Sequence, residues 1–249
     1  MRKIFVLMLL LMMLTGCGLR EASSPETTMP PVEVTAPETM TVETTQPPTV
    51  PTTVPTEPET VPTLPPEPES DEVFVRVLDY IPTASQELMY GTEANFTGQV
   101  IYDFEDAYLR WGTVKKLMQV SRDLEELGLY IKIWDGFRPV SAQFKLWEVC
   151  PNPTYVANPT TGYSSHSRGN TIDLTLVDAQ GRELTMPTGF DDFSVKANRD
   201  YSDCTEEETN NAQLLEILME KHGFSGYFGE WWHYSDTTGY PVEREFEPQ

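Results

Sequence analysis

SSHSRGNTID, residues 164–173, is the stretch from which the rest of the chain can be understood, together with EWWH at residues 230–233. A zinc ion used for hydrolysis is held by about three imidazole or carboxylate ligands, with a further position left for water. His166, Asp173 and His233 supply such a set, and the chain contains one other histidine, His222. The two stretches therefore predict a metal site built from distant parts of the sequence.

The second half of the first stretch predicts a β-strand. Polar and aliphatic residues alternate from Thr171 to Leu176. Because successive side chains of a strand face opposite sides of the sheet, the aliphatic residues would be buried on one face and Asp173 turned to the other. Residues three apart on a regular strand face opposite ways, so Glu230 can reach the same ion as His233 only from a turn or bulge.

Neither stretch is specific by itself. A His-x6-Asp pair is common by chance, and a serine-rich turn before a strand needs no metal to explain it. A third motif adds weight, because Arg138 follows a predicted strand in the turn DGFRP, residues 135–139. An arginine just past a strand end is usually a solvated surface charge, but a guanidinium also offers permanently charged donors to a developing oxyanion.

Together these motifs resemble the zinc D-alanyl-D-alanine dipeptidases of the vancomycin-resistance type, which are related to D,D-carboxypeptidases and share a fold with the hedgehog signalling domain. The matching segments occur in the family's order and cover nearly all of the chain after residue 73: NFTGQ (95–99), DGFRP (135–139), SSHSRGNTIDLTL (164–176), MPTGFDDF (186–193) and EWWHY (230–234). One departure is Pro187, where the family usually has glycine. The resemblance implies an α+β fold in a single domain, with a mainly antiparallel sheet and packed helices.

The resemblance also implies a role for each site residue. One zinc ion per chain would be bound by His166, Asp173 and His233. Glu230 would act as general base and then as general acid. The remaining implied roles are oxyanion stabilisation by Arg138, binding of the substrate's amino terminus by Ser164, and lining of the site by Asp191.

The substrate implied by the resemblance is D-Ala-D-Ala or a similar small D,D-dipeptide, cleaved in peptidoglycan turnover or in glycopeptide resistance. Two alternatives stay open. The domain could be a D,D-carboxypeptidase acting on peptidoglycan stem peptides, or a non-catalytic domain that binds wall peptides. The second alternative predicts loss of the base or of the oxyanion donor, and both Glu230 and Arg138 are present. The sequence predicts no oligomeric state.

The first 72 residues predict an exported, anchored protein. Residues 1–17 combine two early basic residues with an apolar run that is too short to span a bilayer, which is typical of a signal peptide. The run ends in a segment resembling a lipoprotein lipobox, so lipidation is expected at Cys17. Residues 18–72 hold 13 of the 21 prolines and eleven acids against one arginine, which predicts a disordered, extended linker. We therefore expect a lipid-anchored location on the extracytoplasmic face of the cell membrane.

The remaining segment, residues 73–249, is long enough for one domain with a hydrophobic core. The net charge of −22 argues against a nucleic-acid partner, whose phosphates an acidic surface would repel. Cys150 and Cys204 remain after lipidation of Cys17, and in an oxidising compartment they are candidates either for a disulfide or for two free buried thiols.

Sequence patterns place most elements of this domain. Strands are predicted at residues 73–78 and 130–134, and helices at residues 105–127, 141–149 and 205–222. The third helix opens with a capping box, Thr205 to Glu208, and its end accounts for His222 without a metal. Residues 178–181 predict a hairpin turn that returns residues 182–186 antiparallel.

Overall fold

The centre of the molecule is a five-stranded sheet, which the computed structural model describes within residues 64–249. Its strand order is β2-β4-β5-β7-β6, and only the short β2–β4 pair is parallel. The strands are β2 (Ser85–Gln86), β4 (Leu129–Asp135), β5 (Thr171–Asp178), β7 (Glu230–Asp236) and β6 (Phe224–Tyr227). The predicted α+β domain with a mainly antiparallel sheet is confirmed.

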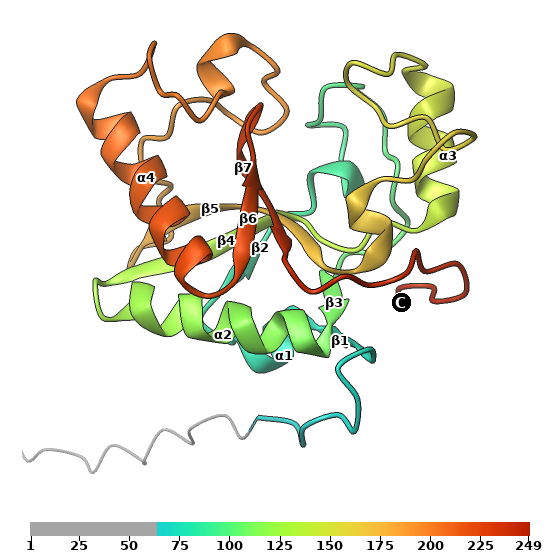
Figure 1. Ribbon diagram of the computed structural model, residues 1–249, viewed down its shortest axis with the longest axis horizontal. Helices are drawn as coiled ribbons and strands as arrows, with labels where there is room; N and C mark the ends of the chain where they lie inside the picture. The colour runs from blue at the N-terminus through green and yellow to red at the C-terminus, as the bar shows by residue number, and fades with distance from the viewer. Residues whose placement is uncertain (1–63) are drawn as a thin grey trace, which may run out of the picture. The chain divides into compact units, whose positions relative to one another are not determined.

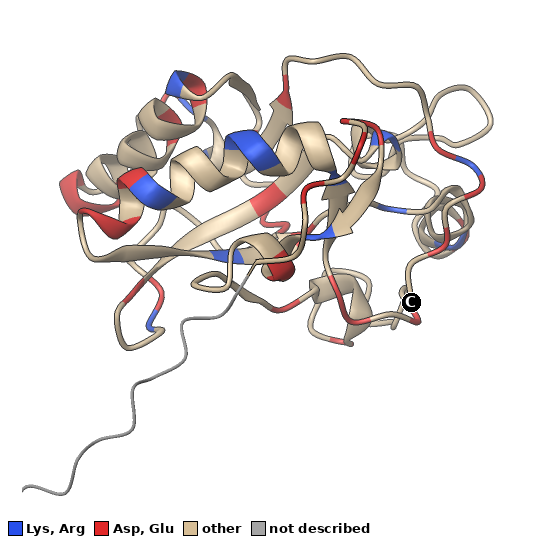
Figure 2. Ribbon diagram, turned by 90° about the horizontal axis from the view of Figure 1, so that it is seen from below, with Lys and Arg blue, Asp and Glu red and all other residues tan. Residues whose placement is uncertain are grey.

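Helices and a second small sheet surround these strands. The α-helices are α1 (Val77–Tyr80), α2 (Trp111–Glu125), α3 (Val140–Val149) and α4 (Glu206–Lys221), and the 3-10 turns are η1 (Met89–Gly91), η2 (Ser165–Arg168) and η3 (Val195–Ala197). The second sheet pairs β1 (Phe74–Arg76) with β3 (Tyr108–Arg110). Figure 1 shows α2 along one side of the main sheet, with α4 and α3 at opposite ends of the molecule. Acidic and basic residues are interspersed along these elements (Figure 2).

The strand that carries Asp173 is buried along almost its whole length. The aliphatic residues Ile172, Leu174 and Leu176 are 0% exposed, as the alternation predicted. Thr171 and Thr175 on the opposite face are also fully buried, and Asp173 is 3% exposed. Since both faces of β5 are covered, the carboxylate of Asp173 lies inside the fold, where a charged group needs a partner.

Two predicted elements differ from the structure. The helix predicted from residue 105 begins only at Trp111, because the residues before it form β3 and pair with β1. The strand predicted at residues 73–78 ends at Arg76, and Val77 opens the short helix α1. In both places a hydrophobic pattern was mistaken for one continuous element, although the chain changes direction within it.

Other predicted elements are confirmed. The hairpin turn at residues 178–181 forms, with the Gly181 amide donating to the Asp178 carbonyl at 2.9 Å. The capping box of α4 is complete, and His222 closes this helix with Nε2 2.7 Å from Asp123 Oδ2. Trp231 and Trp232 are both fully buried.

Of the two alternatives left open for Cys150 and Cys204, the disulfide is not formed, because both cysteines are free and half-buried. Cys150 ends α3, whereas Cys204 lies just before α4, and these helices stand at opposite ends of the domain (Figure 1). A disulfide requires the two Cα atoms to lie within about 7 Å. The second alternative, two free thiols, is the one that the structure shows.

The predicted signal peptide, Cys17 and most of the predicted linker lie outside the described residues. The end of that linker, residues 64–72, is described and contacts the domain. The Tyr80 hydroxyl donates to the Pro66 carbonyl at 3.0 Å, and the Gly112 amide donates to the Asp71 carbonyl at 3.0 Å. Within residues 64–249, no helix combines the length and the apolar character needed to cross a membrane.

Candidate metal centre

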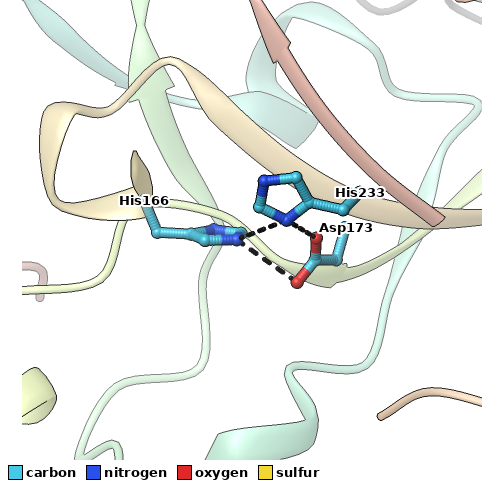
Figure 3. A group of neighbouring side chains, drawn as sticks. All are labelled: His166, Asp173 and His233. Carbon is cyan, nitrogen blue, oxygen red and sulfur yellow. Dashed lines mark hydrogen bonds and ion pairs between the residues drawn. The ribbon is translucent and has the colours of Figure 1, made fainter. Parts of the chain in front are cut away.

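The three predicted ligands converge, although they come from three different elements. His166 lies on η2, Asp173 on β5 and His233 on β7, where it is the direct strand partner of Asp173. Their ligand atoms all lie within 4.8 Å of one another. Asp173 Oδ2 is 3.3 Å from His166 Nε2, and Asp173 Oδ1 is 2.9 Å from His233 Nδ1 (Figure 3).

The local sequence explains why His166 reaches this position. The Ser164 side chain accepts a hydrogen bond from the His166 amide at 3.3 Å and so caps η2. Gly169 then turns the chain into β5 with a φ of 73°, a conformation that favours glycine. A Cβ at Gly169 would also lie 2.3 Å from the Phe74 ring. The turn therefore requires glycine for two reasons, the positive φ and the close contact with Phe74.

Each imidazole ring is oriented through the nitrogen that points away from Asp173. His166 Nδ1 lies 2.8 Å from the Gly136 carbonyl and donates to it, which leaves Nε2 with a free lone pair. His233 Nε2 lies 3.3 Å from Ser165 Oγ, so that Nδ1 faces Asp173. His233 therefore presents Nδ1 to the candidate metal position, whereas His166 presents Nε2.

These donor atoms fit a metal cation. Asp173 Oδ1 is buried, and within the described part of the chain its one close polar contact, with His233 Nδ1 at 2.9 Å, lacks the geometry of a hydrogen bond. Burial raises the pKa of Asp173, but His166 and His233 outweigh that effect and hold the pKa well below its usual value. An ionised carboxylate and two inward ring nitrogens, from which a bound cation would displace protons, form at this spacing the donor set that a divalent ion such as Zn²⁺ binds.

Glu230 lies beside the metal ligands. It is the first residue of β7, next to an irregularity in the β6–β7 pairing, as the spacing of Glu230 and His233 required. Its Oε2 is 3.5 Å from His233 Nδ1. Burial is the main cause that raises the pKa of Glu230, and the negative charge of Asp173 adds to it. A carboxylate with a raised pKa is a better proton acceptor near neutral pH.

Arg138 is buried rather than solvated, at 8% exposed. Its Nη2 donates to Asp135 Oδ2 at 2.6 Å and its Nη1 to Gln143 Oε1 at 3.0 Å. The same Asp135 oxygen lies 3.6 Å from His166 Nδ1. Asp135 therefore links the guanidinium to a metal ligand, a connection that the sequence analysis missed although both residues belong to one motif.

One cavity of about 300 Å³ collects all of the predicted site residues. Ser164 and Asp191 line it together with Arg138, Glu230 and the three ligands. Asp191 has a φ of 54°, and its Oδ2 accepts a hydrogen bond from the Tyr90 hydroxyl at 2.7 Å. Burial raises the pKa of Asp191 to about 8, against the effect of that hydrogen bond.

Aromatic side chains that sequence reasoning missed form part of the cavity wall. The Tyr155 and Phe193 rings, both at the cavity, lie 5.0 Å apart, and Phe96 packs on Phe193 at 5.4 Å. The three residues come from separate loops, so no spacing in the sequence connects them. Phe96 belongs to the NFTGQ segment and Phe193 to the MPTGFDDF segment, whereas Tyr155 lies in none of the quoted segments.

Two imidazoles and a carboxylate around one point, with a second carboxylate and a guanidinium beside them, define the class of mononuclear metal-dependent hydrolases. The comparisons with known proteins narrow this class. A family model described as Peptidase_M15, D-ala-D-ala dipeptidase, matches residues 70–247. On that match the chain belongs to the D-Ala-D-Ala dipeptidase family of peptidases, and it is a metallopeptidase.

Individual relatives agree with the family. The D-alanyl-D-alanine dipeptidase of Escherichia coli (strain K12) is 36% identical over 163 residues, which cover 65% of this chain and 84% of the relative. The protein of the same name from Enterococcus faecalis (strain ATCC 700802 / V583) is 33% identical over 165 residues, which cover 58% and 82%. A solved structure of VanYB in complex with D-Alanine-D-Alanine aligns at 15% identity and a TM-score of 0.36, over 55% of this chain and 79% of that one.

Proposed function

We propose that the protein is a zinc-dependent dipeptidase that hydrolyses D-Ala-D-Ala or a similar small D-amino-acid dipeptide. The observation that carries this proposal is the convergence of the His166, Asp173 and His233 ligand atoms in one cavity with Glu230 and Arg138. The family match and the names of the relatives supply the substrate class.

The donor set supports zinc. Two imidazole nitrogens and one carboxylate oxygen are a ligand combination used by catalytic zinc sites, which keep a further position open. Bound zinc would polarise the peptide carbonyl and lower the pKa of water at that position. Asp135 and the Gly136 carbonyl lie behind His166 and hold its ring in the binding orientation.

The side chains around the ligands would perform the proton and charge steps. Glu230 takes a proton from the attacking water and returns it to the leaving amine, which its raised pKa favours. Arg138 lies at the cavity with a permanent positive charge and faces the oxygen on which negative charge develops. Because its other contacts fix the guanidinium, little reorganisation is needed when that charge appears.

The size of the cavity favours a short substrate. About 300 Å³ is at the lower end of the range for ligand pockets and is sufficient for a dipeptide. The packed rings of Tyr155 and Phe193 limit the cavity on one side. Ser164 and Asp191 are the polar groups that we assign to the bound dipeptide, with Ser164 at its amino terminus.

We also propose that the enzyme acts outside the cytoplasm, anchored through lipid on Cys17 at the extracytoplasmic face of the membrane. The apolar run and lipobox-like segment before Cys17 support this location. At that place the substrates would be D-Ala-containing peptides released from peptidoglycan. Replacing Cys17 with alanine should abolish incorporation of labelled fatty acid into the protein, and unchanged incorporation would refute the lipid anchor.

One assay tests the reaction. Purified protein is analysed for metal by elemental analysis and incubated with D-Ala-D-Ala, with L-Ala-D-Ala and with a stem pentapeptide. We expect one zinc per chain and rapid D-alanine release from D-Ala-D-Ala alone. Release of D-alanine from the pentapeptide only would show a carboxypeptidase instead. Absence of release from all three peptides would favour a binding domain.

A further inference from the structure

The β6–β7 hairpin leaves regular pairing where it carries two site residues. Gly226 pairs with Tyr234, but the next residue, Tyr227, pairs with Glu230. This shift leaves three residues of β7 without a partner on β6, namely Trp231, Trp232 and His233. Since strand side chains alternate, such extra residues are what allow Glu230 and His233 to face one cavity although they are three positions apart.

The side chain of Arg199 occupies the place of the missing strand partners. This side chain is 7% exposed, and its guanidinium has five N–H groups. Three hydrogen bonds go to backbone carbonyls of the hairpin: from Nε to Tyr227 at 2.9 Å, and from Nη2 to Trp231 at 2.9 Å and His233 at 3.0 Å. Nη1 donates to the Tyr234 hydroxyl at 3.0 Å and lies 3.3 Å from Glu216 Oε1.

The hairpin is also shaped to admit this side chain. A Cβ at Gly226 would lie 2.3 Å from Arg199 Cζ and 2.5 Å from its Nε, so any larger residue there would displace the guanidinium. The backbone amide of Arg199 donates to the Phe228 carbonyl at 2.9 Å, and Cζ lies 4.3 Å from the centre of the Tyr234 ring. Arg199 is thus fixed to the hairpin from both its backbone and its side chain.

We propose that Arg199 is a positioning residue, which holds the irregular part of β7 in the conformation that turns Glu230 and His233 toward the metal centre. The inference rests on the proposed function for the roles of those two side chains. Without the guanidinium, the carbonyls of Trp231 and His233 would lose their donors, and an unpaired buried carbonyl is unfavourable. Regular pairing with β6 would supply new donors, but a changed register turns side chains to the other face.

The first test compares Arg199→Met, which removes all donors at similar length, with Arg199→Lys, which keeps the charge and the donors of one ammonium group but loses the planar fork. Binding of Zn²⁺ is measured by competition with a chelator, and hydrolysis of D-Ala-D-Ala by steady-state kinetics. For Arg199→Met we expect about 10- to 100-fold weaker Zn²⁺ binding and a kcat lower by about 10²-fold. Arg199→Lys should lie between this variant and the wild type, and the visible spectrum of Co²⁺-loaded protein should change in both.

A control separates positioning from general destabilisation. Leu124→Ala truncates a fully buried side chain of α2, away from the hairpin, and should lower Tm. Below its Tm this variant should keep the Zn²⁺ affinity and kcat of the wild type. An equal loss of Zn²⁺ affinity in Leu124→Ala would overturn the positioning role.

Gly226→Ala tests the same idea from the other side of the contact, and it remains informative if Arg199→Met does not fold. We expect weaker Zn²⁺ binding in the wild-type background but little further effect beside Arg199→Lys or Arg199→Met, because the two changes act on one contact. Unaltered Zn²⁺ binding and kcat in Arg199→Met would refute the inference. So would a Gly226→Ala change that weakens Zn²⁺ binding by the same factor in the wild type, in Arg199→Lys and in Arg199→Met. A wild-type protein that releases no D-alanine, with Zn²⁺ binding still weakened in Arg199→Met, would refute the proposed function and leave the role of Arg199 intact.

Discussion

Asp191 should make the metal-free protein less stable as pH rises, so that Asp191→Asn is stabilising above neutral pH. The pKa of Asp191 is raised from 3.8 to about 8, with burial as the largest cause. Between these values the native state holds a proton that the unfolded state has lost, and therefore stability falls with increasing pH. An asparagine has no charge to bury and also tolerates the φ of 54° at this position.

The magnitude follows from the same pKa values. Each tenfold change in proton affinity is worth about 1.4 kcal/mol, so the pKa of about 8 sets an upper limit of roughly 6 kcal/mol on the cost of ionising Asp191. Since the carboxylate lines an open cavity and is only half-buried, water reduces this cost, and we expect about 1–3 kcal/mol above pH 8. For a domain of this size that is a gain of roughly 3–10 °C in Tm.

The assay compares thermal unfolding of wild type, Asp191→Asn and Asp192→Asn, each freed of metal with a chelator, from pH 4 to pH 9. Asp192 is the exposed neighbour and provides the same change of charge. The gap between Asp191→Asn and the wild type should be close to zero at pH 4 and largest above pH 8, while Asp192→Asn shows no such gap. A gap that does not depend on pH, or an Asp191→Asn variant less stable than wild type at pH 8, would refute the reasoning.

Other changes at the site give separate outcomes. Glu230→Gln should lower kcat by about 10²- to 10⁴-fold with zinc content by elemental analysis unchanged, and a near-normal kcat would contradict its role as base. Arg138→Lys keeps the charge but loses the fork that also binds Asp135, so steady-state kinetics should show a kcat lower by about 10²-fold or more, with wild-type kinetics as the opposing result. Tyr155→Ala combined with Phe193→Ala opens the cavity wall and should raise D-alanine release from tripeptides relative to dipeptides. An unchanged ratio would show that these two rings do not determine substrate length. Chelation should lower Tm, and added Zn²⁺ should restore it, because a hundredfold excess over Kd adds about 2.7 kcal/mol to the free energy of unfolding. A Tm that responds to neither would contradict metal binding.

The ligand set could be predicted from the sequence because its ligands lie in short motifs that together resemble one family, although neither stretch is specific by itself. The turn before β5 needs a cap at Ser164 and a left-handed residue at Gly169, and both are visible in the sequence. The alternation that follows fixes which face Asp173 occupies. Local rules of this kind do not depend on the rest of the fold.

The start of the helix predicted from residue 105 was less accessible to such rules. Tyr108 to Arg110 continue the apolar pattern of α2, but β1 lies beside them and supplies a strand partner. The same limit applies to Asp191, whose raised pKa arises from burial among the loops around the cavity. A property that depends on long-range packing leaves no local spacing to recognise.

The irregular pairing of β7 shows how these two kinds of information combine. The spacing of Glu230 and His233 already required a departure from a regular strand, so that the sequence predicted a turn or a bulge there but not what stabilises it. The stabilising group is Arg199, about thirty residues earlier in the chain. A single arginine in a loop carries no sequence signal of such a role. Three of the Arg199 hydrogen bonds go to backbone carbonyls of the hairpin that regular pairing would otherwise have satisfied. The EWWH motif therefore defines which side chains take part in the chemistry. Arg199, which lies outside every motif, determines whether Glu230 and His233 can both face the metal centre.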